Sequence, residues 1–142
     1  MIIGILAVIL IGGGLYFVST LKPKNETTSV PVAALPYADE IHIKTPLQNT
    51  QVISPIKITG EARGSWYFEG SFTAELFDSN SSSLGSTQVT AQSAWTTENF
   101  VPFLGNLTFS SPATKKGSLI IKNSNPSGLP ENEKQITIPV SF

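Results

Sequence analysis

The chain has 142 residues, a net charge of -1 at pH 7 and no cysteine. Without a run of Lys or Arg it lacks the electrostatic footprint of nucleic-acid binding, so we expect no nucleic-acid partner. The absence of cysteine excludes a disulfide, a Cys-ligated zinc site, a thiol nucleophile and a lipid-modified cysteine anchor. With a charged share of only 13%, 11 glycines and 10 prolines, the composition suits short strands and many turns, and packing must stabilise the fold.

The N-terminal segment, residues 1–21, contains no charged residue. At a rise of about 1.5 Å per residue, a helix of this length spans roughly 30 Å, which is the hydrocarbon thickness of a bilayer. A cleaved signal peptide is the alternative, but it needs a basic start and a small-x-small cleavage site, and residues 18–20 form only a poor one. We therefore predict a transmembrane anchor over residues 1–21.

Residues 22–39 have the composition of a linker. Pro23, Pro31 and Pro36 stand among Ser, Thr, Asn and Ala, which favours extended, unpaired backbone over helix or sheet. This division leaves residues 40–142 for a single folded domain.

Beyond the linker, apolar and polar residues alternate, and turn-forming residues interrupt this pattern about every ten positions. The alternation predicts seven strands, and an antiparallel sheet with one wet face produces it. We therefore expect an all-β, immunoglobulin-like sandwich of two sheets packed face to face. Pro139 in the last strand should lie at an edge or a bulge, because proline cannot donate to a sheet ladder. The apolar positions of the seven strands are Ile41 and Ile43; Ile56 and Ile58; Phe72, Ala74 and Leu76; Val89 and Ala91; Val101, Phe103, Leu107 and Phe109; Leu119 and Ile121; and Ile136, Ile138, Val140 and Phe142.

Sequence motifs of catalysis are missing. The single histidine, His42, alternates with two isoleucines, so we interpret it as an exposed strand residue and not as a catalytic base. The sequence contains no G-x-S-x-G elbow, P-loop, H-E-x-x-H motif or dinucleotide fingerprint. We expect no enzyme activity, no catalytic residue and no cofactor. An envelope hydrolase would need clustered polar residues around His42 or a serine in a cleft.

The run from Asp78 to Ser82 resembles the start of a calcium-binding loop. It lacks the mid-loop glycine, however, and its twelfth position is Val89 instead of glutamate. Asp, Asn and Ser are also the residues that stabilise tight turns. We predict a hairpin turn here and no metal site.

Three aromatic residues follow one another at positions 66–68. Neighbouring strand residues face opposite ways, so Tyr67 is exposed if Trp66 and Phe68 fill the core. An exposed aromatic side chain beside an arginine is typical of binding surfaces. Alternatively, all three pack inside, because a small domain without disulfides needs its large side chains for burial. The candidate interaction surface predicted on this basis consists of Arg63, Trp66, Tyr67, Glu69 and Trp95.

Several short motifs lie between Ile41 and Phe142. The most specific are Ser54-Pro55, Gly60-Glu61-Ala62 and Phe68-Glu69, followed by Trp95, Phe100 and Pro102-Phe103. Together they resemble the Gmad2 immunoglobulin-like domain of bacterial spore-germination and sporulation proteins. The resemblance implies an extracytoplasmic sandwich that is attached to a membrane or to another module, has an interaction role and carries no catalytic residues. The turn after Asp78 departs from the family by lacking a glycine.

The orientation of the domain depends on two opposing signals. Lys22 and Lys24 follow the apolar run, and the positive-inside tendency alone would place the domain in the cytoplasm. The polar, linker-tethered β domain and the family resemblance favour the extracytoplasmic side, which we predict.

We expect a single-pass membrane protein and a non-enzymatic interaction module of a bacterial cell envelope, whose unknown partner is an envelope protein or a glycan. The alternative is a passive structural spacer or assembly subunit, linked to sporulation or germination.

Overall fold

The computed structural model describes residues 33–142, which belong to one compact unit. The predicted transmembrane anchor, residues 1–21, and residues 22–32 of the predicted linker lie outside the described residues. Within residues 33–142, no helix has the length and apolar character needed to cross a membrane.

The described part of the chain is all-β. All seven predicted strands are present, and an eighth, the two-residue β2, is too short to show an alternating pattern. Two short 3-10 helices, η1 (Gly64–Trp66) and η2 (Pro130–Asn132), interrupt the strands. The strands are β1 (Ile41–Thr45), β2 (Thr50–Gln51), β3 (Ile56–Arg63), β4 (Ser71–Asp78), β5 (Ser83–Ala91), β6 (Phe100–Leu107), β7 (Lys116–Lys122) and β8 (Gln135–Ser141).

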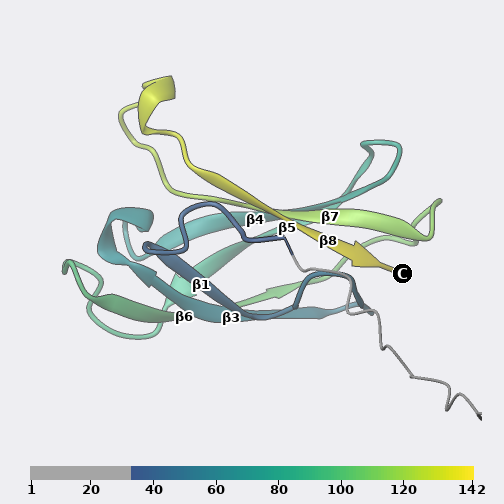
Figure 1. The fold of residues 1–142 in the computed structure, drawn as a ribbon, viewed down its shortest axis with the longest axis horizontal. Coiled ribbons are helices and arrows are strands. Elements are labelled where there is room, and N and C mark those ends of the chain that lie inside the picture. The colour runs from purple at the N-terminus through teal and green to yellow at the C-terminus, as the bar shows by residue number, and fades with distance from the viewer. Residues whose placement is uncertain (1–32) are drawn as a thin grey trace, which may run out of the picture. The chain divides into compact units, whose positions relative to one another are not determined.

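The strands form one hydrogen-bonded sheet in the order β1-β3-β6-β5-β4-β7-β8-β2. The sheet curls, so that β1, β3 and β6 face β4, β7 and β8 across the interior (Figure 1). We predicted two separate sheets, and β5 is the reason for the difference. This strand pairs with β4 along most of its length, and its end pairs with β6 through Thr90 opposite Leu104 and Ala91 opposite Phe103. A nine-residue strand is long enough to connect the two layers.

The core lies between the two layers. Burial alternates residue by residue along β3 and β4, as the sequence pattern predicts. At its centre, the ring of Phe72 lies 5.1 Å from those of Tyr67 and Phe103 and 6.1 Å from that of Trp66. Such aromatic pairs contribute about 0.5–1.5 kcal/mol each beyond the burial of their area. Packing of this kind replaces the missing disulfides.

Pro139 pairs with Ser118 of β7, while its carbonyl oxygen accepts a hydrogen bond from the Asn49 amide at 2.7 Å. The nitrogen and oxygen of one strand residue point to the same side, so the missing N–H of Pro139 faces away from β7. On that side the only neighbour of β8 among the strands of residues 33–142 is β2. The proline therefore lies near an edge, as its chemistry requires.

The segment from Asp78 to Ser82 is a hairpin turn between β4 and β5, as predicted. The buried Asp78 carboxylate accepts hydrogen bonds from the backbone amides of Asn80 and Ser82, both at 2.9 Å. Ser81 has a φ of 64° and adopts the left-handed conformation for which we expected a glycine. Across residues 33–142, no group of three or more His, Cys, Asp or Glu side chains is placed to hold a metal ion.

Candidate binding site

The segment after β3 places the aromatic residues 66–68 differently from the sequence prediction. Because η1 is a 3-10 helix, it breaks the two-residue period that a strand would have. Trp66 and Tyr67 are therefore both buried, with 0% and 4% exposure, whereas Phe68 is 45% exposed. Neither alternative from the sequence is met: Tyr67 is not exposed, and Phe68 is not packed inside with the other two.

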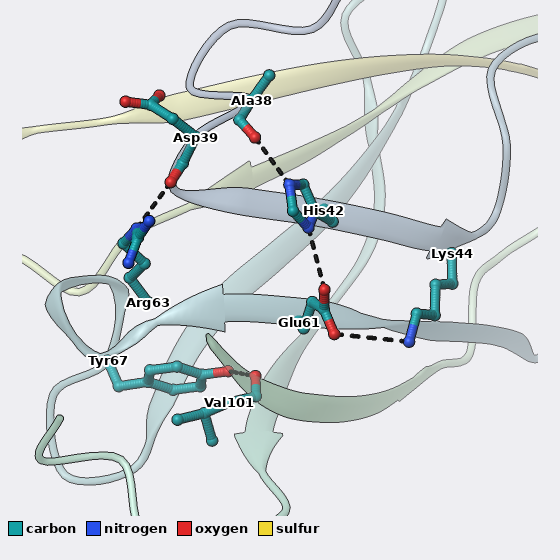
Figure 2. Close-up of polar contacts among 8 residues, drawn as sticks. All are labelled: Ala38, Asp39, His42, Lys44, Glu61, Arg63, Tyr67 and Val101. Carbon is teal, nitrogen blue, oxygen red and sulfur yellow. Dashed lines mark hydrogen bonds and ion pairs between the residues drawn. The ribbon is translucent and has the colours of Figure 1, made fainter. Parts of the chain in front are cut away.

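Tyr67 contributes to the folded structure through its buried ring and its hydroxyl group. Its hydroxyl donates a hydrogen bond to the carbonyl oxygen of Val101 at 2.8 Å (Figure 2). Burial also raises the pKa of the phenol above its ordinary value of 10.0. The side chain is thus enclosed and hydrogen-bonded, and it offers no surface to a partner.

The indole of Trp66 is held by a cluster of three further residues, Tyr37, Glu40 and Lys134. The indole N–H donates to the Glu40 carboxylate at 3.2 Å, and this carboxylate also forms an ion pair with the ammonium group of Lys134. The Tyr37 ring packs edge-on against Trp66 at 6.0 Å, and the Lys134 ammonium lies 5.8 Å from the centre of the Tyr37 ring. The Glu40 cluster, comprising Trp66 and these three residues, joins the turn before β1 to η1 and to the start of β8.

Arg63 at the end of β3 forms hydrogen bonds with two separate segments of backbone. Its guanidinium donates to the backbone oxygens of Asp39 at 2.7 Å and Glu98 at 2.8 Å, and it lies 4.6 Å from the centre of the Phe100 ring. The bond to Asp39 is drawn in Figure 2. The predicted site residue therefore fixes the turn before β1 and the loop of residues 92–99.

Trp95 and Glu69 retain more exposed surface. Trp95 is half-buried against the core, and Glu69 is exposed with a φ of 50°. The loop that carries Trp95 lies against η1, where Gly64 donates its N–H to the Thr97 oxygen at 3.1 Å. A side chain at Gly64 would overlap the backbone oxygens of residues 95 and 97, so this approach requires glycine. The five predicted residues thus share one end of the domain but do not form one surface.

His42 is exposed on β1, as predicted. Its Nδ1 lies 3.0 Å from the Glu61 carboxylate and its Nε2 lies 2.8 Å from the Ala38 carbonyl oxygen, as Figure 2 shows. Both of these partners are hydrogen-bond acceptors. The bond from His42 holds the pKa of Glu61 below its ordinary value of 4.5, and Lys44 contributes further. The ring stacks on Phe100 with a centroid separation of 4.5 Å.

A polar groove of about 350 Å³ opens at the end of the domain that carries η1. One side is formed by Ser65 and the other by the loop between β7 and β8. We missed this groove because the Asn and Ser residues of that loop are common turn formers and lie about 60 positions from Ser65. Its polar lining includes Ser65, Asn123, Asn125, Ser127, Glu131, Asn132 and Lys134.

Comparison with protein families gives a match to Gmad2, described as the immunoglobulin-like domain of bacterial spore germination, over residues 40–128. The chain belongs to the Gmad2 family. The resemblance noted from the sequence motifs is thereby confirmed, and it covers η1 and the loop of residues 92–99. The Gmad2 match also includes the groove residues Asn123 to Ser127. Comparison with curated proteins and with solved structures gives no match.

Proposed function

We propose that this Gmad2 domain is a non-enzymatic binding module of a bacterial cell envelope, and that its partner is an envelope protein or glycan. In this proposal residues 1–21 anchor the chain in a membrane, with the domain on the extracytoplasmic side. The uncharged N-terminal segment and the family's description as a domain of bacterial spore germination support it. The observation that carries it is the polar groove at the end of the domain that carries η1. The exposed Phe68 and Glu69 follow η1 in the chain.

The backbone at this end is well suited to binding because it is held in place. Ser124 donates its N–H to the Trp66 oxygen at 3.0 Å, which joins the β7–β8 loop to η1. Asn123 donates its N–H to the Lys134 oxygen at 3.0 Å, which closes the base of the same loop. Loops that a rigid scaffold positions are the usual carriers of binding sites. The C-terminus lies at the other end of the domain (Figure 1).

We propose a non-enzymatic role because His42, the single histidine, lies away from the polar groove. Its ring lies on the outer face of the sheet with both nitrogens in contact with Glu61 and Ala38. The polar groove is lined by other residues, and its charged members are Glu131 and Lys134. A general base must reach the proton that it abstracts, and His42 belongs to a different surface.

Site-specific crosslinking would test the binding role. A photoreactive amino acid replaces Phe68 in one variant and Ile53 in a matched control, and both variants are expressed as the full chain in intact bacterial cells. Phe68 is 45% and Ile53 is 78% exposed, and Ile53 follows Val52, whose N–H donates to the Ser141 oxygen near the C-terminus. We expect discrete products from position 68 alone. Equal products, or none from either position, would contradict the binding role and favour the structural spacer.

The proposed orientation can be tested because the chain has no native cysteine. A single cysteine in place of Ser111, which is exposed, would be the only reactive thiol. We expect a membrane-impermeant maleimide to label this variant in intact cells as fully as in lysed cells. Labelling after lysis only would place the domain in the cytoplasm.

A further inference from the structure

The size and lining of the polar groove indicate what it can hold. Its volume of about 350 Å³ lies at the lower end of the range of small-molecule sites, about 300–1,000 Å³. Peptides are usually bound by adding a strand to a sheet edge or by filling an apolar groove. This groove has walls of loop and 3-10 helix, lined mainly by hydroxyl and amide side chains. It therefore suits a short segment of a polar ligand.

The amide groups of the groove are held in place by the protein. Asn123 donates to the Asn132 oxygen at 3.0 Å, Asn125 donates to the Leu129 oxygen at 2.8 Å, and Asn132 donates to the Ser127 hydroxyl at 3.1 Å. A primary amide has two N–H donors, and each of these bonds uses one. Each asparagine thus retains a donor in a fixed orientation, so binding would cost little side-chain entropy.

Tyr37 supplies an aromatic ring that contacts Lys134, one of the groove residues. Tyr37 is 36% exposed, and the centre of its ring lies 5.8 Å from the Lys134 ammonium. Tyr37 has a φ of 60°, a left-handed conformation that is costly for a bulky residue and inexpensive for glycine or asparagine. The turn alone does not require an aromatic residue. The Tyr37 ring packs edge-on against Trp66, and the part of the residue that remains exposed is accessible to a ligand.

Charge disfavours an anionic ligand in the groove. The ammonium of Lys134 is already paired with Glu40 inside the Glu40 cluster. Glu131, at the rim, is exposed and would repel a negative charge. A neutral ligand can still make two kinds of contact. Its apolar C–H groups can pack on the aromatic ring, and its carbonyl and hydroxyl oxygens can accept hydrogen bonds from the N–H donors.

We propose that this groove binds a neutral glycan that carries acetamido groups. Tyr37 stacks against one sugar ring, and Asn123, Asn125 and Asn132 donate N–H groups to acetamido and hydroxyl oxygens. The carbonyl of an acetamido group is the better acceptor for three fixed amide donors, which favours such sugars over plain hexoses. This inference rests on the proposed function and names the ligand class of the same end of the domain.

Titration of the full ¹⁵N-labelled chain, in mild detergent, with an N-acetylglucosamine tetramer tests the proposal. The side-chain amide signals of Asn123, Asn125 and Asn132 should shift, whereas those of Asn80 and Asn106, which are exposed on other parts of the domain, should not. A maltose-type glucose tetramer, which lacks acetamido groups, should bind more weakly. Tyr37→Ser should weaken binding of the first tetramer about tenfold, the effect of one lost stacking contact, and Tyr37→Phe should retain it.

Three results would overturn this inference: no shift of the three amides, equal binding of both tetramers, or unchanged binding by folded Tyr37→Ser protein. If the glycan fails but position 68 still crosslinks to a protein, the binding module stands and its ligand is a protein. If both experiments fail, the proposed function fails as well.

Discussion

Two neighbouring regions at one end of the domain use their side chains in opposite ways. Trp66 and Tyr67 are buried, and their polar atoms are bonded to Glu40 and Val101. The groove next to them is lined by amides and hydroxyls that contact solvent. In the sequence, Trp66 and Tyr67 belonged to the candidate interaction surface, yet they form the support. In our proposal the Asn- and Ser-rich loop forms the binding surface. Substitutions that affect stability and binding separately can test this difference between the two regions.

The largest effect is expected for Trp66→Ala. Removing a fully buried indole from its contact with Phe72 should lower the free energy of unfolding by about 3–5 kcal/mol, because a cavity remains. Urea denaturation measures the change. The matched control is Phe68→Ala, which removes a neighbouring but 45% exposed ring and should cost about 1 kcal/mol or less. Equal losses would contradict the assignment of Trp66 to the core.

Tyr67→Phe should have the next largest effect. It keeps the ring but leaves the Val101 carbonyl without its hydrogen bond, which should cost about 1–3 kcal/mol. The same denaturation measurement applies. Tyr37→Phe is the control and should leave the free energy of unfolding nearly unchanged, because the Tyr37 ring is partly exposed and its packing on Trp66 is retained.

Ionisation of Tyr67 should make the stability of the domain depend on pH, with a smaller effect and a defined direction. Its pKa is raised in the folded protein by burial, so the folded state binds this proton more tightly than the unfolded state. The resulting stability is present below the ordinary pKa of 10.0 and is lost as the pH rises above it. Unfolding temperatures across alkaline pH should fall less steeply in Tyr67→Phe than in the native chain. Parallel pH profiles would show that Tyr67 ionises freely.

Glu61, on the outer face, should give the smallest effect. Its pKa is lowered mainly by the hydrogen bond from His42, so its contribution to stability is present above 4.5 and is lost as the pH falls through the lowered value. Glu61→Gln should flatten the acid limb of the stability profile slightly, because the pair is solvent-exposed. An unchanged acid limb would indicate that the hydrogen bond from His42 to Glu61 makes no measurable contribution to stability.

Much of the fold follows from the sequence because alternation directly reports which face of a strand is buried. Ile56, Ile58, Phe72 and Leu76 all point inward as that period requires. Both alternatives for residues 66–68 failed because η1 changes the period. A local signal of this change is Gly64, since glycine often interrupts a strand. The two-residue β2 carries too few residues to show a period.

The candidate site was less predictable than the fold. Ser65 and Asn123 become neighbours only because the sheet places the β7–β8 loop beside η1, where the Ser124 amide donates to the Trp66 oxygen. Such a juxtaposition depends on tertiary packing and leaves no periodic trace in the sequence. The concentration of amide and hydroxyl side chains between Asn123 and Asn132 was the one available signal, and turn formation explains it equally well.

The central claim is that the aromatic pair supports the domain while the groove and Tyr37 bind the ligand. The most direct test compares Tyr37→Ser with Tyr67→Phe, measuring for each the unfolding temperature and the affinity for the N-acetylglucosamine tetramer. We expect Tyr37→Ser to lose affinity and to lose only the stability that its edge contact with Trp66 contributes. Tyr67→Phe should lose stability while the protein that remains folded binds normally. The reverse result, with affinity lost in Tyr67→Phe and retained in Tyr37→Ser, would contradict the claim.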